Sequence, residues 1–322
     1  MKILLVRLSS MGDLIHTLPA VEDLARQCPE VELHWLCEAG FADIARLHPF
    51  VKKVHVMKWR QWHKHLLQAE TWREIGRLKT DLQAESFDFV LDSQGLIKSA
   101  CFAKMAKSPI YGLDKHSARE SLAALAYSKT FAVPKGKNAV WRNRELFAQV
   151  FGYTMPETQV FGLSVPESGR LKNLQSPYYV ALHATSRDSK LWPIEHWRAL
   201  LKKLNEEQQC TVYLPWGNET EKMRAEQIAS DLPFAFVCDK MNLLQAAFLL
   251  KNAVGIIGVD TGLLHLANAL EKPVVGIYTD TDPAKTGVQV SAYAKNLGGI
   301  AQIPNVDEVY QTLMDCVAAY GK

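Results

Sequence analysis

The sequence predicts an α/β protein built from two Rossmann-like domains. Strand-like and helix-like stretches alternate through the first half, give way to a Pro-, Gly- and Ser-rich stretch at residues 152–178, and then alternate again. Such alternation is typical of a parallel sheet covered by helices on both faces. We expect one domain at residues 1–163 and another at 164–322, facing each other across a cleft. The C-terminal helix is a candidate to complete the first domain.

Hydrophobic runs define the expected elements of each half. Short apolar runs predict strands, and apolar residues spaced by three or four predict helices. In the first half we expect strands at 2–8, 31–37 and 87–92, and helices at 13–27, 71–85, 96–106, 118–128 and 140–152. In the second half we expect strands at 178–183, 210–216, 234–237, 255–260 and 273–279, and helices at 193–204, 219–229, 243–253 and 263–270.

Composition argues against several classes of protein. The 37 Lys and Arg residues nearly balance 34 Asp and Glu, and a net charge of +3 is too small to indicate nucleic-acid binding. The six cysteines form no CxxC pair, and the N-terminus lacks the pattern of a signal peptide. No apolar run reaches the roughly 20 residues that a membrane-spanning helix needs. We therefore expect a cytoplasmic protein whose contact with a membrane, if it has one, is peripheral.

Polar segments follow the predicted strands. In open α/β sheets ligands bind beyond the carboxyl ends of the strands, where loops meet helix N-termini. This rule selects six segments as candidate sites: SSMGD at 9–13, SQG at 93–95, HATSRDSKLWP at 183–193, PWGNETE at 215–221, DTGLLH at 260–265 and TDTDP at 279–283.

The DTGLLH segment is a candidate anion site. Asp260 ends a strand, and Thr261 and Gly262 begin a helix whose first backbone N–H groups lack partners within the helix. Asp and Thr are also favoured as ordinary helix caps, so both interpretations stay open. His265, one turn into the helix, has the usual position of a core histidine.

The segment ATSRDSK combines hydroxyl groups with cations. Thr185, Ser186, Arg187 and Lys190 could together hold a diphosphate without a metal, because cationic donors and hydroxyls neutralise the charge on a departing phosphate. A solvated polar loop is the alternative. Glu221 and Met241 follow two further strands, where a carboxylate could accept from ribose hydroxyls and a thioether could cover a base. By spacing alone both are ordinary helix residues.

The first half carries a basic, aromatic segment. Residues 58–79 interleave Lys, Arg and His with three Trp, and more cations follow at Arg119, Arg142 and Arg144. A run of charge is usually a solvated helix face. The aromatic residues nevertheless make this segment suitable for an anionic amphiphile at a membrane surface.

Five motifs in order resemble one family. LSSMGDLIHTLP, DSQGLIKSA, ATSRDSKLWPIEHW, LPWG and VDTGLLHLANAL are similar to the heptosyltransferases of lipopolysaccharide inner-core synthesis, and most similar to those that add the first heptose. The resemblance runs nearly end to end. It implies a GT-B fold and inverting transfer of heptose from ADP-L-glycero-β-D-manno-heptose to the first Kdo of Kdo2-lipid A, on the cytoplasmic face of the inner membrane of a Gram-negative bacterium.

The resemblance also implies roles for individual residues. Asp13 would be the general base, beside Ser10 and Gly12, and Lys190 would support departure of ADP. The implied donor-binding residues are Thr185, Ser186, Lys190, Glu221, Met241, Asp260, Thr261, Gly262 and His265. The implied acceptor-binding residues, besides Ser10 and Gly12, are Arg60, Lys64, Arg119, Arg142 and Arg144.

Three positions depart from the pattern of the family. His63 and Asn138 stand where close relatives are expected to have Arg and His. Asp280 creates a DTD triplet with Asp282, which looks like a metal-binding motif, but Asp282 already belongs to the family's own GPTDP pattern. We expect no metal site and no cofactor.

Other functions stay open as alternatives. A sister enzyme that adds the second heptose would share the fold and the donor motifs. A non-catalytic nucleotide-binding protein would keep DTGLLH without needing Asp13. A Rossmann oxidoreductase is disfavoured, because the first turn reads SSMGD and lacks the GxGxxG of dinucleotide sites.

Overall fold

The computed structural model describes residues 1–321 and divides the chain into two compact units. Unit 1 spans Met1–Ser164 and unit 2 spans Val165–Lys322. Lys322, the last residue of the predicted second domain, lies outside the described residues. The division falls one residue after the boundary expected from the sequence, and residues 152–177 contain no helix or strand apart from a single 3-10 turn, η4 (Glu167–Gly169).

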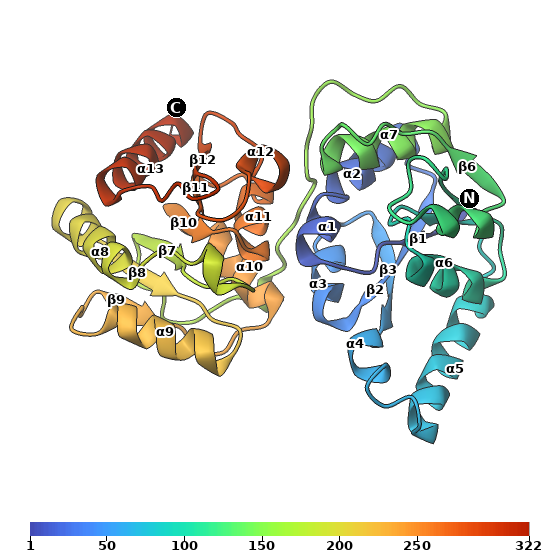
Figure 1. Ribbon diagram of the computed structural model, residues 1–322, viewed down its shortest axis with the longest axis horizontal. Coiled ribbons are helices and arrows are strands. Elements are labelled where there is room, and N and C mark those ends of the chain that lie inside the picture. The colour runs from blue at the N-terminus through green and yellow to red at the C-terminus, as the bar shows by residue number, and fades with distance from the viewer. Residues whose placement is uncertain (322) are drawn as a thin grey trace. The chain divides into compact units, whose positions relative to one another are not determined.

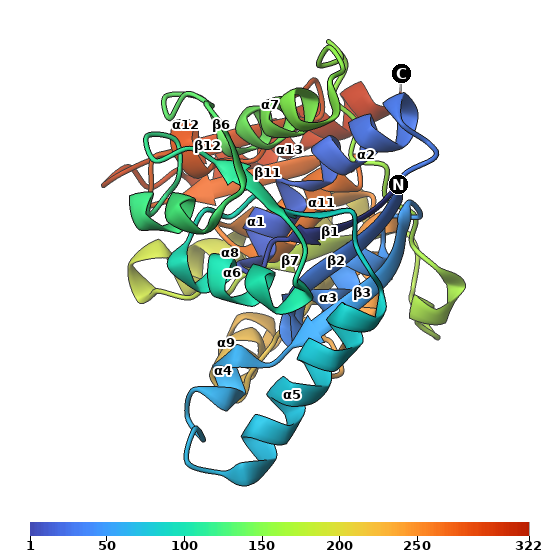
Figure 2. The same cartoon turned by 90° about the vertical axis from the view of Figure 1, so that its right-hand side faces the viewer.

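Unit 1 is built on a six-stranded parallel sheet of order β3-β2-β1-β4-β5-β6. Its strands are β1 (Lys2–Val6), β2 (Glu32–Glu38), β3 (Val51–Met57), β4 (Phe89–Asp92), β5 (Ile110–Leu113) and β6 (Lys129–Phe131). Its helical elements are α1 (Met11–Ile15), α2 (Leu18–Gln27), η1 (Ala39–Phe41), α3 (Ala42–Arg46), α4 (Trp59–Trp62), α5 (Ala69–Ala84), α6 (Ile97–Ala103), η2 (Lys104–Ala106), η3 (Ser121–Ala126) and α7 (Ala139–Phe151). Helices α2 and α7 cover one face of this sheet, and α5 and α6 cover the other (Figures 1 and 2).

Unit 2 repeats this architecture, with a parallel sheet of order β12-β11-β10-β7-β8-β9. Its strands are β7 (Tyr178–Leu182), β8 (Thr211–Leu214), β9 (Ala235–Val237), β10 (Gly255–Val259), β11 (Val274–Tyr278) and β12 (Ala294–Gly298). Its helical elements after η4 are η5 (Asp188–Lys190), α8 (Ile194–Gln208), α9 (Glu219–Ala229), α10 (Leu243–Lys251), α11 (Gly262–Ala269), α12 (Pro283–Thr286) and α13 (Val306–Tyr320). Read from β9, the order is that of unit 1 read from β3.

Each unit has its own hydrophobic core. In unit 1, Leu4 and Val6 of β1 pack with Leu78 and Leu82 of α5. In unit 2 the centre of the core is formed by Trp192 and Trp197, which meet edge to face with their ring centroids 5.1 Å apart. Because both cores are contained within their units, each sheet can present its strand ends on a rigid support.

Three expectations about the elements of unit 1 need correction. The helix expected at 13–27 is two helices, because Pro19 lies at the start of α2 and its missing N–H and bulky ring stop α1 from continuing. The helix expected at 118–128 is only the short 3-10 segment η3, in which Leu122 and Leu125 stay exposed and no apolar face is buried. The strands β3, β5 and β6 were not expected; β5 and β6 are too short for a clear period.

The C-terminal helix belongs to unit 2, contrary to the expectation that it could complete the first domain. Val309, Tyr310, Leu313 and Cys316 of α13 are buried in the core of unit 2, against α8, β10 and β11. This apolar stripe holds the helix to the sheet that directly precedes it in sequence. None of the helices within residues 1–321 is both long and apolar enough to cross a membrane.

Candidate active site

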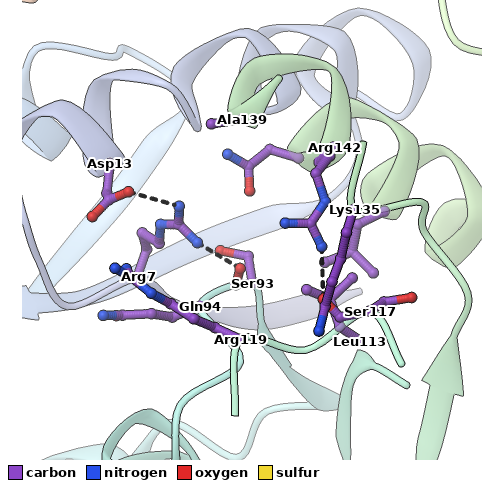
Figure 3. A pocket seen from close by; sticks show the side chains of 12 residues that line it. Arg7, Asp13, Ser93, Gln94, Leu113, Ser117, Arg119, Lys135, Ala139 and Arg142 are labelled. Carbon is purple, nitrogen blue, oxygen red and sulfur yellow. Dashed lines mark hydrogen bonds and ion pairs between the residues drawn. The ribbon is translucent and has the colours of Figure 1, made fainter. Parts of the chain in front are cut away.

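A polar cavity of about 420 Å³ lies at the carboxyl ends of the central strands of unit 1 (Figure 3). Strands β1 and β4 are neighbours, but the chain leaves them toward opposite edges of the sheet, which opens a crevice at their ends. The cavity is lined by Arg7, Asp13, Ser93, Gln94, Leu113, Ser117, Arg119, Lys135, Ala139, Arg142, Asn143 and Leu146. The strand order therefore places the SSMGD and SQG segments together.

Asp13 lies in the first turn of α1 with its side chain 28% exposed at the cavity. One carboxylate oxygen, Oδ2, accepts from the backbone N–H of Ser10 at 2.8 Å and from its hydroxyl at 3.2 Å. The other oxygen, Oδ1, accepts from Arg7 Nη2 at 3.3 Å. Asp13 thus serves as a helix cap, as the simpler interpretation of the sequence holds, and it also faces a cavity where a ligand hydroxyl could reach it.

Arg7 orients the Asp13 carboxylate from beneath. It follows β1 directly, is 8% exposed, and also donates from Nη1 to the Ser93 carbonyl at 2.6 Å. Burial lowers the pKa of Arg7, while the nearby Asp13 and Asp92 carboxylates oppose this shift. A guanidinium stays protonated at neutral pH even so, which makes Arg7 a fixed positive charge between the two polar segments.

The SQG turn is held by a fully buried carboxylate. Asp92, the last residue of β4, accepts from the N–H groups of Gln94 at 3.0 Å and Gly95 at 3.2 Å, from the Ser99 hydroxyl at 2.7 Å and from the Tyr127 hydroxyl at 2.8 Å. Burial raises the pKa of Asp92, and these four donors act in the opposite direction. Gly95 has φ of +67°, and a Cβ there would approach the Ala118 backbone at 3.3 Å, so the turn requires glycine.

Three further cations line the cavity: Arg119, Lys135 and Arg142. Arg119 and Lys135 are exposed, whereas Arg142 is half-buried and donates from Nη2 to the Ser117 carbonyl at 2.7 Å (Figure 3). Burial lowers the pKa of Arg142, and its buried Nε atom lacks a hydrogen-bond partner among the described residues. A wall with this charge suits an anionic ligand carrying carboxylate or phosphate groups.

Five residues predicted to bind the acceptor are not among those that line this cavity: Ser10, Gly12, Arg60, Lys64 and Arg144. Ser10 and Gly12 lie at the start of α1, next to Asp13. Arg60 and Lys64 lie exposed on α4 and the loop after it, with the Arg60 guanidinium 4.8 Å from the centre of the Phe41 ring. Arg144 is buried in a two-pronged ion pair, with Nε 2.6 Å from Asp23 Oδ2 and Nη2 3.2 Å from Oδ1. Arg144 therefore has a structural role. Successive residues of a helix point in different directions, and this one points into the interior of unit 1.

Two departures from the family pattern have local roles. Asn138 caps α7, accepting from the Trp141 N–H at 2.8 Å. His63 is exposed after α4, stacks on Trp59 and contacts its carbonyl through Nδ1 at 2.6 Å.

In unit 2 most of the predicted donor-binding residues follow β7 or β10, whereas Glu221 and Met241 follow β8 and β9. Asp260 is the centre of this group: its Oδ2 lies 2.6 Å from Lys190 Nζ and accepts from the Thr281 hydroxyl at 2.9 Å, and its carbonyl accepts from Thr185 Oγ1 at 2.6 Å. Strands β7 and β10 are the central pair of the second sheet. The same crevice rule that selects the cavity of unit 1 therefore applies here.

Helix α11 begins directly beyond this network. Thr261 is its N-cap, but the Thr261 side chain accepts no hydrogen bond from the first N–H groups of the helix, and Gly262 is its first residue. His265 is 9% exposed, one turn further on. Ser186 is exposed on the loop after β7, near the half-buried Thr185. Hydroxyls, a lysine and free backbone N–H groups at a helix start are the groups that commonly bind phosphate.

Glu221 lies after β8, and Met241 lies after β9. Glu221 Oε2 accepts from the Gly217 N–H at 2.7 Å and Oε1 from the Asn218 amide at 2.9 Å, which makes it part of the cap of α9. Met241 is half-buried just before the cap of α10. Asp280 accepts from the Ser189 hydroxyl at 2.6 Å, and Asp282 caps α12.

Several lining residues of the first cavity were missed by sequence reasoning. Arg7 was read only as part of a strand, and SQG was noted as a candidate segment without a role for Ser93 or Gln94. The signal for these residues was their position directly after β1 and β4. Ser117, Lys135 and Asn143 gave no such signal, because they reach the cavity through the folding of later segments.

Two parallel-sheet α/β units, each with polar side chains gathered at the ends of its central strands, define the class of the protein by fold, as a two-domain protein of the GT-B type. The sequence model of glycosyltransferase family 9 (heptosyltransferase) matches residues 75–317. Lipopolysaccharide heptosyltransferase 1 of Escherichia coli K12 is 39% identical over 92% of both chains, and the Pseudomonas aeruginosa protein of the same name is 40% identical over 89% of this chain and 81% of its own. The chain belongs to glycosyltransferase family 9.

Solved structures agree with this assignment. E. coli heptosyltransferase WaaC with ADP superposes with a TM-score of 0.91 at 36% identity, over 98% of this chain and 100% of that one. The structure of WaaC with ADP-2-deoxy-2-fluoro heptose gives a TM-score of 0.86 at 34% identity, with both chains fully covered. E. coli heptosyltransferase II, at 20% identity and a TM-score of 0.81 with full coverage of both chains, shares the fold.

Proposed function

We propose that the protein transfers L-glycero-D-manno-heptose from ADP-L-glycero-β-D-manno-heptose to the first Kdo of Kdo2-lipid A, with inversion at the anomeric carbon. The observation that carries the proposal is the end-to-end similarity to enzymes named lipopolysaccharide heptosyltransferase 1, one of which is solved with ADP and with an ADP-heptose analogue. The carboxylate of Asp13 in a cationic cavity and the phosphate-binding groups around Asp260 are consistent with it.

Transfer of the second heptose is the alternative. A lipooligosaccharide heptosyltransferase 2 of Haemophilus influenzae matches only 30% of this chain at 27% identity. The E. coli K12 and P. aeruginosa proteins named lipopolysaccharide heptosyltransferase 1 match about nine-tenths of it at 39% and 40%. Incubation with Kdo2-lipid A and with its monoheptosylated form separates the two. Heptose incorporation into the second substrate alone would favour the alternative.

In the proposed reaction Asp13 is the general base. The acceptor hydroxyl oxygen attacks the anomeric carbon, the bond from this carbon to the diphosphate breaks, and ADP departs with the bonding electrons. Asp13 accepts the hydroxyl proton as the new bond forms. Arg7 and Ser10 each donate a hydrogen bond to the Asp13 carboxylate, so the orientation of this carboxylate is fixed before the substrate binds.

Replacement of Asp13 by Asn tests this role. Asparagine keeps the size of the side chain but cannot accept the proton, so we expect kcat to fall by roughly 10²-fold to 10⁴-fold while ADP binding, measured by calorimetry, stays within error of the wild type. Glu30→Gln, on an exposed carboxylate of the same unit, is the matched control and should retain full activity. A near-normal kcat in Asp13→Asn would remove Asp13 from the mechanism.

Lys190 and the groups around Asp260 would stabilise the departing ADP. Losing one fixed donor of this kind often costs roughly 10²-fold to 10³-fold in rate. We expect Lys190→Ala to weaken ADP binding and lower kcat together, and activity to persist in EDTA, since these groups neutralise the diphosphate without a metal. Loss of activity on chelation, restored by Mg²⁺ or Mn²⁺, would contradict the metal-free reaction.

A membrane surface is the proposed location of the acceptor. The segment around the start of α5 projects away from the sheet of unit 1 (Figure 2) and exposes Leu66, Leu67 and Trp72 to 39%, 103% and 59%. Exposed cations lie in the same stretch of chain: Lys64, Arg77, Lys79 and Arg73, the last of which pairs with Glu70. Apolar side chains flanked by cations suit an anionic bilayer such as the cytoplasmic face of an inner membrane.

Vesicle binding tests this contact. We expect Leu67→Asp to weaken binding to phosphatidylglycerol vesicles several-fold and to leave turnover of a delipidated acceptor unchanged. Leu125→Asp, on another exposed leucine of unit 1, is the control. Equal binding by wild type and Leu67→Asp would show that this segment does not contact lipid.

A further inference from the structure

Two histidines and a glutamate lie together on unit 1, in a cluster that the proposed reaction does not use. His34 is on β2, His55 is on β3 and Glu85 follows α5. Their nearest ligand atoms all lie within 4.8 Å of one another, and they are the one group of this kind within residues 1–321. The rings of both histidines are almost fully buried, at 3% and 4% exposure.

The spacing of the ligand atoms fits a tetrahedral metal ion. His34 Nδ1 lies 3.1 Å from His55 Nε2 and 3.9 Å from Glu85 Oε2. Two zinc–nitrogen bonds of about 2.0–2.1 Å at a tetrahedral angle place the nitrogens roughly 3.3 Å apart. The edge of Phe87 packs against both imidazole rings and fixes their planes. The Glu85 carboxylate would have to move closer to the two rings for all three atoms to bind one ion.

The hydrogen bonds of His34 direct one of its ring nitrogens to the cluster. His34 Nε2 lies 3.0 Å from Glu32 Oε1, so Nε2 carries the proton and Nδ1 presents its lone pair. Glu85 accepts hydrogen bonds from Lys53 and Lys2.

The same two lysines compete with a metal. Lys53 Nζ lies 2.5 Å from Glu85 Oε1, and Lys2 Nζ lies 3.0 Å from Oε2 and 3.2 Å from Glu32. A carboxylate has enough lone pairs to keep these hydrogen bonds while Oε2 binds a cation. The ammonium groups nevertheless repel a divalent ion, which limits the affinity and makes it sensitive to either lysine.

The cluster borders a cavity and is separate from the reaction site. This cavity, of about 360 Å³, lies between β3 and α5 and is lined by Lys53, His55 and Asp81, so it reaches one of the three proposed ligands. Lys2, which pairs with Glu85, begins β1, whereas Asp13 follows the opposite end of that strand. A ligand here would bridge β2, β3 and the end of α5 without occupying the acceptor cavity.

We propose that His34 Nδ1, His55 Nε2 and Glu85 Oε2 form a zinc site, with water as the fourth ligand. Zinc binds histidine nitrogens and carboxylate oxygens, usually as four ligands in a tetrahedral arrangement. Binding requires the Nε2 proton of His55 to move to Nδ1, which is a change of tautomer and leaves the charge of the ring unchanged. Bound zinc would stabilise unit 1, where it joins three elements.

Cobalt substitution tests the site, because four-coordinate Co²⁺ has intense visible absorption bands. We titrate the full-length protein with CoCl₂ and then with ZnCl₂, and expect one equivalent of Co²⁺ to give these bands and Zn²⁺ to displace it. His55→Gln and Glu85→Gln should abolish the bands, and Glu32→Gln should weaken zinc binding by roughly 10-fold to 100-fold. Lys53→Met should tighten zinc binding, because it removes a competing cation.

The double variant His63→Gln/His65→Gln is the control for cobalt binding by surface histidines. It removes two exposed imidazoles and should leave the bands unchanged. Circular dichroism checks that each variant is folded, and a rise in the melting temperature of wild type with zinc, absent in Glu85→Gln, supports the site independently. Absence of the bands in wild type, or their persistence in folded Glu85→Gln, would overturn the proposal. Turnover by the zinc-free enzyme tests the proposed glycosyl transfer separately.

Discussion

At the scale of single residues, burial separates carboxylates and cations that look alike in the sequence. Asp13 keeps 28% of its side chain exposed at a cavity, whereas Asp92 is fully buried and fixes a turn. Arg142 faces the same cavity, but Arg144, two positions later, pairs with Asp23 in the interior. The chemistry open to each charge is set by these surroundings.

The Arg144–Asp23 pair should contribute to stability and leave catalysis unaffected. Arg144→Ala leaves the Asp23 carboxylate buried without its partner, which typically costs about 3–5 kcal/mol in the free energy of unfolding. Urea unfolding followed by circular dichroism measures this loss. We expect the folded variant to keep its KM for the acceptor. A normal stability combined with a raised KM would return Arg144 to the acceptor site.

His183 should make the stability of the protein sensitive to acid. It is completely buried, and burial followed by the nearby Arg224 lowers its pKa from 6.5 to about 4. The unfolded chain therefore binds a proton before the folded one does, and stability is lost as the pH falls from 6.5 to 4. At pH 5 this amounts to about 2 kcal/mol. Urea unfolding at pH 7 and pH 5 should show the loss.

His183→Leu is the matching variant, because leucine fills the site without titrating. Its unfolding free energy should fall less between pH 7 and pH 5 than that of the wild type. The same fall in both proteins would assign the acid sensitivity to other groups.

At the scale of elements, short caps and tight turns position the site. The buried Asp92 shapes the SQG turn, Ser10 and Asp13 shape the start of α1, and Asn138 begins α7. Helix α7 in turn brings Arg142 and Asn143 to the cavity. A substitution at the first residue of such a helix should therefore affect the site by shifting the residues that the helix carries.

The cap of α7 gives an element-scale prediction. Asn138→Ala removes the acceptor of the Trp141 N–H and should lower the free energy of unfolding by about 1 kcal/mol. Asn138→Ser keeps an acceptor and should cost much less. Thermal unfolding of the two variants measures the difference. Equal stability of the Ala and Ser variants would show that the side chain of Asn138 does not support the helix.

At the scale of the whole molecule, the two units have the same strand order, but the side chains at the ends of their central strands differ in charge. Those of unit 1 include several arginines around one carboxylate, and those of unit 2 combine a lysine with hydroxyls around Asp260. Since each unit has its own core, a ligand that binds one unit should protect that unit first.

ADP should therefore protect unit 2 selectively. At a concentration of 100 times its Kd it adds about 2.7 kcal/mol to the stability of the species that binds it. Hydrogen–deuterium exchange should slow at residues 183–192 and 260–265 and stay unchanged at residues 7–13 and 92–95. Protection appearing mainly in the second pair of segments would assign the nucleotide to unit 1.

The sequence alone determined the α/β class, the two-fold alternation, the linker and most strands and helices, because hydrophobic periodicity reports which faces are buried. It also placed Asp13, Lys190 and the DTG segment among the polar segments that follow buried strands, where ligands bind in open α/β sheets. The strands β3, β5, β6 and β12 were not expected; β3 and β12 carry several Lys and other polar residues, and β5 and β6 have only four and three residues.

Only the tertiary structure decided which cations share a cavity. Arg7 and Ser93 are 86 residues apart and meet because β1 and β4 are adjacent, while Arg142 and Arg144 differ because a helix turns them to opposite surroundings. The pairing of His34 with His55 depends on the register of β2 and β3 in the same way. Such contacts depend on strand order and packing, which local sequence patterns do not encode.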